Sequence, residues 1–254
     1  MYHLLNHIRN GRYIYPNIRI MKNLKRLRAG LSAVCLLSLL LSSCLKSNPS
    51  YNNPPIALVS FFQASPDEPS LDLYFNNNRV NWNPISYGSG LDYFNAFAGQ
   101  RTVNFYAQNT MTKLFSDTLT LKPGGVYSLF LANTPATPGI FVLNDTINRP
   151  PNNTAGIRFV DLSPDAPAVD LALNDSVKVS NKTYKGFSSF TPVAGNKTYS
   201  FKVLQKGTTT VLASLSNVTL TNGYVYTIML TGLSAGTTST DKLSVYYTTN
   251  AQFF

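Results

Sequence analysis

Histidine, cysteine and glutamate are almost absent from this chain. The histidines are His3 and His7, the cysteines are Cys35 and Cys44, and the one glutamate is Glu68. From residue 45 onward there is therefore neither histidine nor cysteine. Their absence excludes Ser-His-Asp and Cys-His catalytic arrangements, zinc sites built from these side chains, and disulfides within the body of the protein.

The body also lacks a strong charge of either sign, although the whole chain has a formal net charge of +10. Residues 1–43 hold seven lysine and arginine side chains and no acid. The rest has 14 basic and 11 acidic residues, a net charge of only +3. A body so nearly balanced lacks the basic stripe that contacts phosphates, so we expect no nucleic-acid partner.

No apolar run is long enough to span a bilayer, which takes about 20 residues. The longest, residues 31–41, follows Met21 and four basic side chains, and the small residues Ser42 and Ser43 come next. This order is typical of a secretion signal. Leu41-Ser42-Ser43-Cys44 resembles a lipobox, which predicts cleavage between Ser43 and Cys44 and acylation of the Cys44 thiol. We interpret residues 1–20 as an extension before a mis-assigned start, and residues 21–43 as the lipoprotein signal peptide.

Acyl chains on Cys44 predict the lipid bilayer as the first partner, since each buried methylene adds about 0.8 kcal/mol of membrane affinity. Residues 44–55 then form the lipidated cysteine and a polar, proline-bearing flexible tether. We expect a protein anchored to the outer membrane by lipid, either periplasmic or surface-exposed, and not cytoplasmic.

The body contains an internal repeat of about one hundred residues in three ordered blocks. The first block (Phe61, Ser65, Pro66, Asp67, Pro69, Asp72, Leu73, Asn76) recurs 98 residues later, from Phe159 to Asn174. The second block (Gly90, Phe94, Ala98, Gly99, Thr102, Phe105) recurs after 96 residues, and the third (Thr120, Leu121, Gly124, Val126, Tyr127, Leu131) after 99. A period this long indicates a repeated domain rather than a solenoid unit.

Each copy has the pattern of an all-β domain. Apolar residues alternate with polar ones in Leu71, Leu73 and Phe75, and no long segment shows helical periodicity. Residues 122–125 (Lys-Pro-Gly-Gly) and Asn222-Gly223 predict two hairpin turns. About 95 residues with roughly seven short strands favour two tandem immunoglobulin-like antiparallel β-sandwiches; a closed barrel is the alternative.

The proline-rich residues 144–154 predict the joint between the copies. We place the first β-sandwich repeat at residues 56–150 and the second at residues 151–254. The repeated apolar residues should form each core, which in the first copy are Phe61, Leu73, Phe94, Phe105, Val126 and Leu131.

The segment Ser-Pro-Asp-Ala-Pro-Ala-Val-Asp at residues 163–170, with a weaker copy at residues 65–72, resembles a family signature. It is similar to that of the domain of unknown function numbered 4397, which occurs in bacterial secreted proteins and lipoproteins, often in tandem. The resemblance covers residues 56–250 and implies a fold and a location, but no activity.

The Ser-Pro-Asp-x-Pro element has two interpretations. Its prolines fix φ, and its Ser and Asp side chains can bond nearby backbone amides, which predicts a rigid turn. Alternatively, Asp161, Asp165 and Asp170 cluster as oxygen ligands for calcium. We favour the turn and expect neither a metal nor another cofactor. Paired aspartates such as Asp67 with Asp72 are the one route to glycoside hydrolysis, and we expect the protein not to be an enzyme.

Trp82 lies in a polar loop, with Tyr87 and Tyr93 close in sequence. These rings are candidate contacts for a sugar or a protein partner. We favour a simpler prediction, in which Trp82 plugs one end of the sandwich.

Three triplets, beginning at Asp117, Asp145 and Asp175, resemble an O-glycosylation acceptor pattern of some gram-negative envelopes. They make Thr118, Thr146 and Ser176 candidate acceptors.

These features predict a non-catalytic cell-envelope lipoprotein that acts as a binding or spacer module, with a glycan or an envelope protein as candidate partner. The first alternative is a structural or assembly subunit of a surface appendage or envelope complex, which would use an unpaired edge strand. The second is a carboxylate-based enzyme acting on glycans.

Overall fold

Strands and turns make up all of the protein that the computed structural model describes, which is residues 53–134 and 136–254. The first eight strands are β1 (Ile56–Gln63), β2 (Leu71–Phe75), β3 (Asn78–Arg79), β4 (Gly90–Phe97), β5 (Gly99–Ala107), β6 (Lys113–Leu121), β7 (Val126–Ala132) and β8 (Gly139–Asn144). The second eight are β9 (Thr154–Asp161), β10 (Val169–Leu173), β11 (Ser176–Lys182), β12 (Thr191–Ala194), β13 (Lys197–Gln205), β14 (Val211–Leu220), β15 (Tyr224–Thr231) and β16 (Ser244–Gln252). Across these described ranges, no helix is long and apolar enough to span a membrane.

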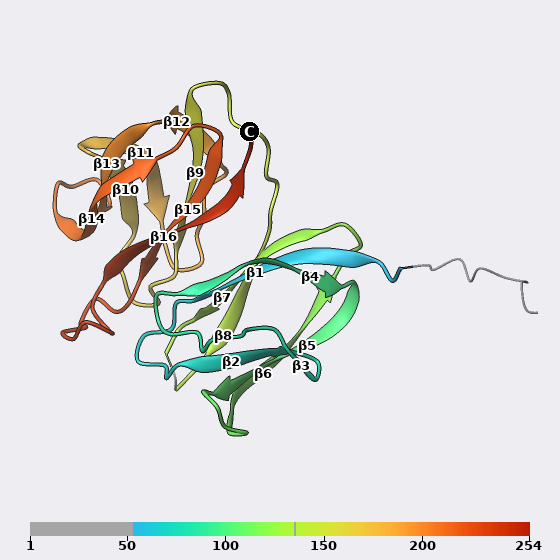
Figure 1. The fold of residues 1–254 in the computed structure, drawn as a ribbon. Helices are drawn as coiled ribbons and strands as arrows, with labels where there is room; N and C mark the ends of the chain where they lie inside the picture. Colours follow the sequence, from blue (N-terminus) through green and yellow to red (C-terminus); the bar gives the residue numbers. More distant parts are fainter. Residues whose placement is uncertain (1–52, 135) are drawn as a thin grey trace, which may run out of the picture. The chain divides into compact units, whose positions relative to one another are not determined.

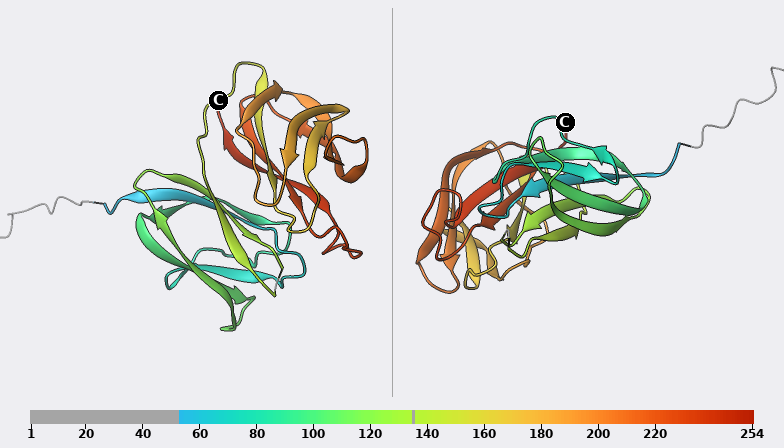
Figure 2. Two further views of the ribbon diagram at one scale, coloured as in Figure 1. Left: turned by 180° about the vertical axis from the view of Figure 1, so that it is seen from behind. Right: turned by 90° about the horizontal axis from the view of Figure 1, so that it is seen from below.

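The strands form two sandwiches of two four-stranded sheets each (Figure 1). The first sandwich has the sheets β4-β1-β7-β8 and β3-β2-β5-β6, and the second has β12-β9-β15-β16 and β11-β10-β13-β14. The two strand orders correspond position by position, and the left view of Figure 2 shows the two sandwiches. The predicted all-β, two-sandwich fold is confirmed.

One strand pair in each sandwich is parallel rather than antiparallel. β1 pairs in parallel with β7, and β9 pairs in parallel with β15. The chain reaches the second member of each pair only after it has formed all four strands of the opposite sheet. A parallel neighbour requires such a long crossover connection, and local turn residues do not reveal it.

The two predicted hairpins are wrong, because each turn crosses from one sheet to the other. β6 and β7 lie in different sheets, as do β14 and β15. The hydroxyl of Tyr127 accepts a hydrogen bond from the Lys122 amide at 3.0 Å, and the hydroxyl of Tyr226 accepts one from the Thr221 amide at 3.1 Å. These are the tyrosine corners of immunoglobulin-like sandwiches. A Cβ atom on Gly125 would lie 2.6 Å from the Tyr127 ring, so glycine serves close packing there.

The expected core residues are largely buried in both copies. Phe61, Leu73, Phe105 and Leu131 are all at most 2% exposed. The exceptions in the first copy are Phe94 and Val126, which are half-buried. Alternation along the strands therefore identifies most of the inward-facing side chains.

The offset of 96 residues expected for the second repeated block is wrong by two residues within β5 and β13. Leu73 lies opposite Phe105, whereas its counterpart Leu171 lies opposite Val203. The counterpart of Phe105 is therefore Val203, at an offset of 98 residues, and not Phe201. A shift of two residues keeps every side chain on the same face of a strand, so alternation alone does not detect it.

Strands β7, β9 and β15 are buried along almost their entire length. The reason is a third apolar cluster, separate from the two sandwich cores, that joins side chains of both sandwiches. It contains Phe62, Ala64, Phe130, Ala132, Leu143, Val160, Leu162 and Met229. These strands are covered on both faces, which accounts for their near-continuous apolar sequences.

Candidate functional site

Trp82 is the most exposed large aromatic ring that the structure describes. It lies in the segment between β3 and β4, and 95% of its surface is accessible to solvent. The prediction that it plugs one end of the sandwich is wrong. Hiding an indole ring from water is favourable by roughly 2 kcal/mol or more, so its exposure is a cost to the free protein that contact with a ligand would relieve.

The loop that carries Trp82 is held by the neighbouring Asn81, which is only 4% exposed. The Asn81 Oδ1 accepts a hydrogen bond from the Leu73 amide at 2.7 Å. Its Nδ2 donates to Asp72 Oδ1 at 3.1 Å and to the Asn83 carbonyl at 2.8 Å. The buried Asn81 side chain thus ties the loop to β2 before the tryptophan and bonds the loop backbone just after it.

Asp72 completes this support. Its Oδ1 also accepts a hydrogen bond from Arg79 Nη2 at 2.6 Å, and its Oδ2 accepts one from the Asn109 amide at 2.9 Å. The Asp72 side chain is 3% exposed and that of Arg79 is 33% exposed. The repeated aspartate of the first sandwich is therefore a structural anchor for the Trp82 loop.

The second sandwich has no equivalent loop. Its β11 is a strand of seven residues, and Val179 pairs with Leu171 on β10. In the first sandwich β3 stops after two residues, and the Asn81 side chain takes the place of backbone pairing. In the first sandwich, the loop that carries Trp82 therefore stands where the second sandwich has the longer strand β11.

Tyr87 and Tyr93 do not lie with Trp82, contrary to the predicted aromatic group. The Tyr87 hydroxyl shares a hydrogen bond of 2.8 Å with Thr231 Oγ1, and its ring packs edge-on against Tyr246 at 5.7 Å. Burial raises the pKa of Tyr87 to about 12. The tyrosines therefore belong to the contact between the sandwiches and not to a surface site.

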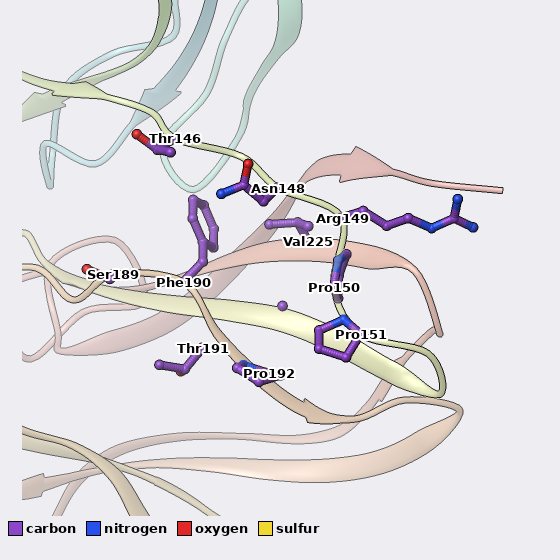
Figure 3. A pocket seen from close by; sticks show the side chains of 11 residues that line it. Thr146, Asn148, Arg149, Pro150, Pro151, Ser189, Phe190, Thr191, Pro192 and Val225 are labelled. Atoms are coloured by element: carbon purple, nitrogen blue, oxygen red, sulfur yellow. The ribbon is translucent and has the colours of Figure 1, made fainter.

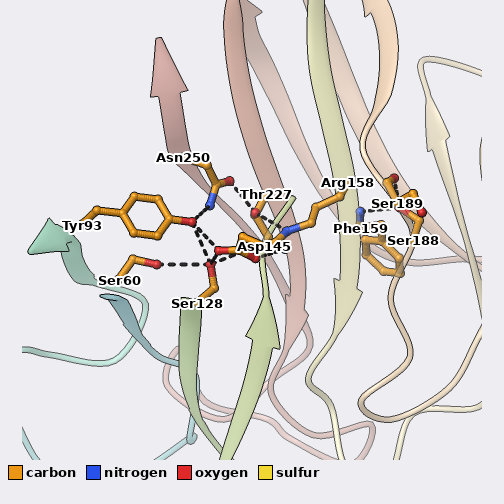
Figure 4. A network of polar contacts seen from close by, with 10 residues as sticks. All are labelled: Ser60, Tyr93, Ser128, Asp145, Arg158, Phe159, Ser188, Ser189, Thr227 and Asn250. Atoms are coloured by element: carbon orange, nitrogen blue, oxygen red, sulfur yellow. Dashed lines mark hydrogen bonds and ion pairs between the residues drawn. The ribbon is translucent and has the colours of Figure 1, made fainter. Parts of the chain in front are cut away.

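Asp145, one residue beyond β8, is the centre of a buried polar network (Figure 4). Its carboxylate pairs with Arg158 Nη1 on β9 and accepts hydrogen bonds from the hydroxyls of Tyr93 and Ser128. The side chains of Asp145 and Arg158 are 0% and 4% exposed. Burial, followed by the nearby Asp145 charge, raises the pKa of Tyr93 to about 12, so this hydroxyl stays protonated and donates.

The same network closes into a ring through the second sandwich. Arg158 Nε donates to Thr227 Oγ1 at 2.7 Å, and Arg158 Nη2 donates to Ser128 Oγ at 2.8 Å. Thr227 donates to Asn250, whose Nδ2 donates to the Tyr93 hydroxyl at 3.1 Å. A buried ion pair needs such additional hydrogen bonds to offset its loss of hydration.

A groove of about 340 Å³ lies between residues 146–151 and the strands β9 and β12 (Figure 3). Phe190, Val225 and three prolines provide its apolar surface, and Arg149 is the one ionisable group among its lining residues. The Arg158 guanidinium lies 4.7 Å from the centre of the Phe190 ring. The sequence does not reveal this groove, because its walls come from four separate segments.

The three aspartates of the second Ser-Pro-Asp-x-Pro element do not form a cation site. Asp165 accepts a hydrogen bond from the Ser234 amide at 2.8 Å, and Asp170 accepts one from the Gly207 amide at 3.0 Å. Asp161 accepts one from the Ser163 amide at 3.0 Å. Within the described residues, no three acidic, histidine or cysteine side chains are close enough to hold a metal. Asp161 thus fixes its own turn, whereas Asp165 and Asp170 fix the backbone of other turns.

Asp161 is fully buried, and one of its oxygens has no hydrogen-bond partner. Burial raises the pKa of its carboxyl group to about 7. Its counterpart in the first sandwich is the neutral Gln63, whose Oε1 accepts a hydrogen bond from the Ser65 amide at 2.7 Å in the same way. Position and hydrogen bonding are conserved between the sandwiches, while the charge is not.

The remaining candidate residues fall into two groups. Thr118, Thr146 and Ser176 are all exposed, as an acceptor for a sugar must be. Ser43 and Cys44 lie outside the described residues, so the predicted cleavage and acylation remain predictions.

In a comparison with known protein families, one family model matches part of this all-β, two-sandwich chain. The model of a domain of unknown function, DUF4397, matches residues 57–172, which extend from β1 into β10. None of the curated proteins matches the sequence.

Two solved structures with limited likeness are carbohydrate-binding modules. One is a family 26 module from Eubacterium rectale in complex with maltoheptaose; it is 9% identical, covers 77% of this chain and 97% of its own, and has a TM-score of 0.26. The other is a family 41 module from streptococcal virulence factors that recognises alpha-glucan; it is 11% identical, covers 75% and 96%, and has a TM-score of 0.23. A likeness this weak carries no argument about the ligand of this chain.

Proposed function

We propose that this chain is a non-catalytic cell-envelope lipoprotein that acts as a binding module. The observation that carries the proposal is Trp82, an almost fully exposed ring on a loop held by buried hydrogen bonds. Loops that present aromatic side chains from a rigid scaffold are a common form of binding site. Exposure of the Trp82 ring to water costs the free protein free energy, and a partner that covers the ring would remove this cost.

The carboxylates of the body support a non-catalytic function. Asp72 and Asp170 each accept hydrogen bonds from the backbone amides of neighbouring turns. Hydrolysis of a glycosidic bond requires two carboxyl groups that face a shared substrate site. The other aspartates of the repeated element are used in the same way, since Asp67 accepts a hydrogen bond from Thr240 Oγ1 at 2.9 Å and Asp165 accepts one from the Ser234 amide at 2.8 Å. These carboxylates therefore suit structural support better than acid–base chemistry.

The proposed location rests on the leader and on Cys44. Acylation there would hold the protein at the outer membrane, either in the periplasm or at the surface. Radiolabelled palmitate should be incorporated into the wild-type protein and not into Cys44→Ser. Digestion of intact cells with an added protease then distinguishes the two faces, since a surface-exposed body is cleaved and a periplasmic one is protected.

Binding is tested by cosedimentation of the mature protein, carrying Cys44→Ser, with isolated envelope fractions. Trp82→Ala should reduce the sedimented fraction at least tenfold, because the exposed ring provides the contact. Met111→Ala is the matched control, since Met111 is also an exposed apolar side chain, 80% accessible, in a turn of the same sandwich. Equal sedimentation of Trp82→Ala and wild type would contradict the proposal.

A spacer function is the second candidate, and the contact between the sandwiches favours it. The buried Asp145–Arg158 pair and the apolar cluster around Phe62 and Met229 restrain both sandwiches together. A rigid pair of sandwiches would hold a bound partner at a set distance from the lipid anchor. Binding and spacing are compatible within one protein.

A further inference from the structure

We propose that the Trp82 loop binds the apolar face of a pyranose ring in an uncharged glycan. This inference rests on the proposed binding function and adds the chemical class of the ligand. A pyranose ring presents C–H groups on one face and hydroxyls around its rim. Its receptor therefore needs one open aromatic face with hydrogen-bonding groups beside it.

The surface beside Trp82 has this composition. A hollow of about 300 Å³ is lined by Arg79, Val80, Asn81 and Trp82. The side chain of Asn83, next to the tryptophan, is exposed and offers both a donor and an acceptor. Arg79 uses Nη2 to bond Asp72 and remains one-third exposed at the rim of the hollow.

The loop is preorganised, which lowers the entropy lost on binding. Asn81 bonds the Leu73 amide, Asp72 and the Asn83 carbonyl, and thus fixes the backbone on both sides of Trp82. Weakly binding ligands such as single sugar rings depend on such a preformed surface. Replacement of Asn81 should loosen the loop and weaken binding without removing the indole ring.

The local charge favours an uncharged ligand over a nucleic acid or an anionic membrane. Arg79 is the one charged residue that lines the hollow, and it is paired with Asp72 at 2.6 Å. Binding to an anionic surface requires unpaired basic side chains in a cluster. A glycan recognised by ring stacking requires no net charge.

The surroundings also favour a sugar over a protein partner. Interface hot spots are often aromatic side chains that lie in well-packed pockets, ringed by further contacts that exclude water. Here the sequence neighbours of Trp82 are two asparagines, of which Asn81 is buried by the scaffold and Asn83 is open to water. The exposed amide side chain of Asn83 beside a single open ring matches a ligand rich in hydroxyls.

Trp82 is the sole tryptophan of the chain, so its fluorescence reports this site alone. The experiment uses the mature protein carrying Cys44→Ser, and hexasaccharides of glucose (α-1,4 and β-1,4), xylose, mannose and N-acetylglucosamine. At least one should shift the emission of Trp82 and protect it from quenching by acrylamide. Calorimetry should show a loss of affinity of at least tenfold in Trp82→Ala and a smaller loss in Asn81→Ala, with Met111→Ala unchanged.

Three results would overturn the inference. The first is that none of the hexasaccharides protects Trp82. The second is a Trp82→Ala variant that binds a hexasaccharide as well as the wild type does. The third is a blue shift of Trp82 emission with phosphatidylcholine or phosphatidylglycerol vesicles and not with sugars, which would assign the loop to the bilayer. If Trp82 is still required for cosedimentation with the envelope, the binding function stands and only the ligand class fails.

Discussion

At the scale of single residues, Gln63 and Asp161 show how the two sandwiches have diverged. Both accept a hydrogen bond from the backbone amide two residues later, and both are fully buried. The glutamine is neutral at every pH, whereas the aspartate must lose a proton in a site that has no cationic partner for it. Desolvation is therefore the main cause of its raised pKa.

This difference predicts a pH dependence of stability. Below about pH 4 the folded and unfolded states both keep the proton of Asp161. Between the unfolded pKa of 3.8 and the folded pKa of about 7, only the folded state keeps it, so stability falls as pH rises through this window. Asp161→Asn should remove this contribution and raise the free energy of unfolding at pH 8 by roughly 4 kcal/mol. Urea unfolding at pH 5 and at pH 8 measures the effect.

The reciprocal variant is the control. Gln63→Asp places a carboxyl group in the corresponding site of the first sandwich and should introduce a similar loss of stability on going from pH 5 to pH 8. A wild-type protein and an Asp161→Asn variant with the same pH profile would show that Asp161 is hydrated or paired in solution.

At the scale of the elements, the sequence reveals where the sharp turns lie but not how the strands on either side of each turn are paired. Proline, glycine and asparagine mark residues 122–125 and 221–223 as sharp turns, which they are. Whether a turn joins neighbours in one sheet or crosses to the other depends on partners distant in sequence. β7 pairs with β1, some seventy residues earlier, and this pairing excludes a hairpin with β6.

Inward-facing residues were predictable for a related reason. Alternation fixes which face a side chain takes, and the expected core residue Phe105 and its repeat Phe201 are fully buried. Val103 and Val203 lie on the same inward faces and are also fully buried. Alternation does not fix which residue opposes which. The order of valine and phenylalanine is reversed between β5 and β13, so the two cores keep the same side-chain volume. Matching phenylalanine with phenylalanine in the sequence therefore shifts the alignment by two residues.

The two tyrosine corners make a matched prediction. Tyr127→Phe and Tyr226→Phe each remove the acceptor of one backbone amide and should each lower the free energy of unfolding by about 1 kcal/mol. Chemical denaturation followed by circular dichroism measures both. Tyr247→Phe is the control, because that ring is 43% exposed on an edge strand. A loss in the control as large as in the corner variants would refute the assignment.

At the scale of the whole described body, the contact between the sandwiches was invisible in the sequence. Ser128, Arg158 and Thr227 occupy the outward positions of their strands, where alternation predicts exposure to water. They are buried because the outer faces of two sheets meet around them. The Trp82 loop was equally hard to place, since the support from Asp72 and Asn81 depends on side-chain geometry.

The buried ion pair predicts a large effect of a single substitution. Arg158→Met leaves the Asp145 carboxylate buried without its partner and should lower stability by about 3–5 kcal/mol. The double variant Arg158→Met with Asp145→Asn should recover part of that loss, because the uncompensated charge is gone. Urea unfolding of the three proteins measures this. Equal stabilities of the single and double variants would show that the charge on Asp145 is not what costs stability.

The most direct test of the account is whether the two sandwiches form one rigid body. The described residues contain no cysteine, so Thr118→Cys and Ser214→Cys, both at exposed sites and one in each sandwich, can carry spin labels in a protein with Cys35→Ser and Cys44→Ser. Pulsed electron resonance should give one narrow distance distribution, which Arg158→Met should broaden. A broad or multiple distribution in the protein with Arg158 intact would contradict the account.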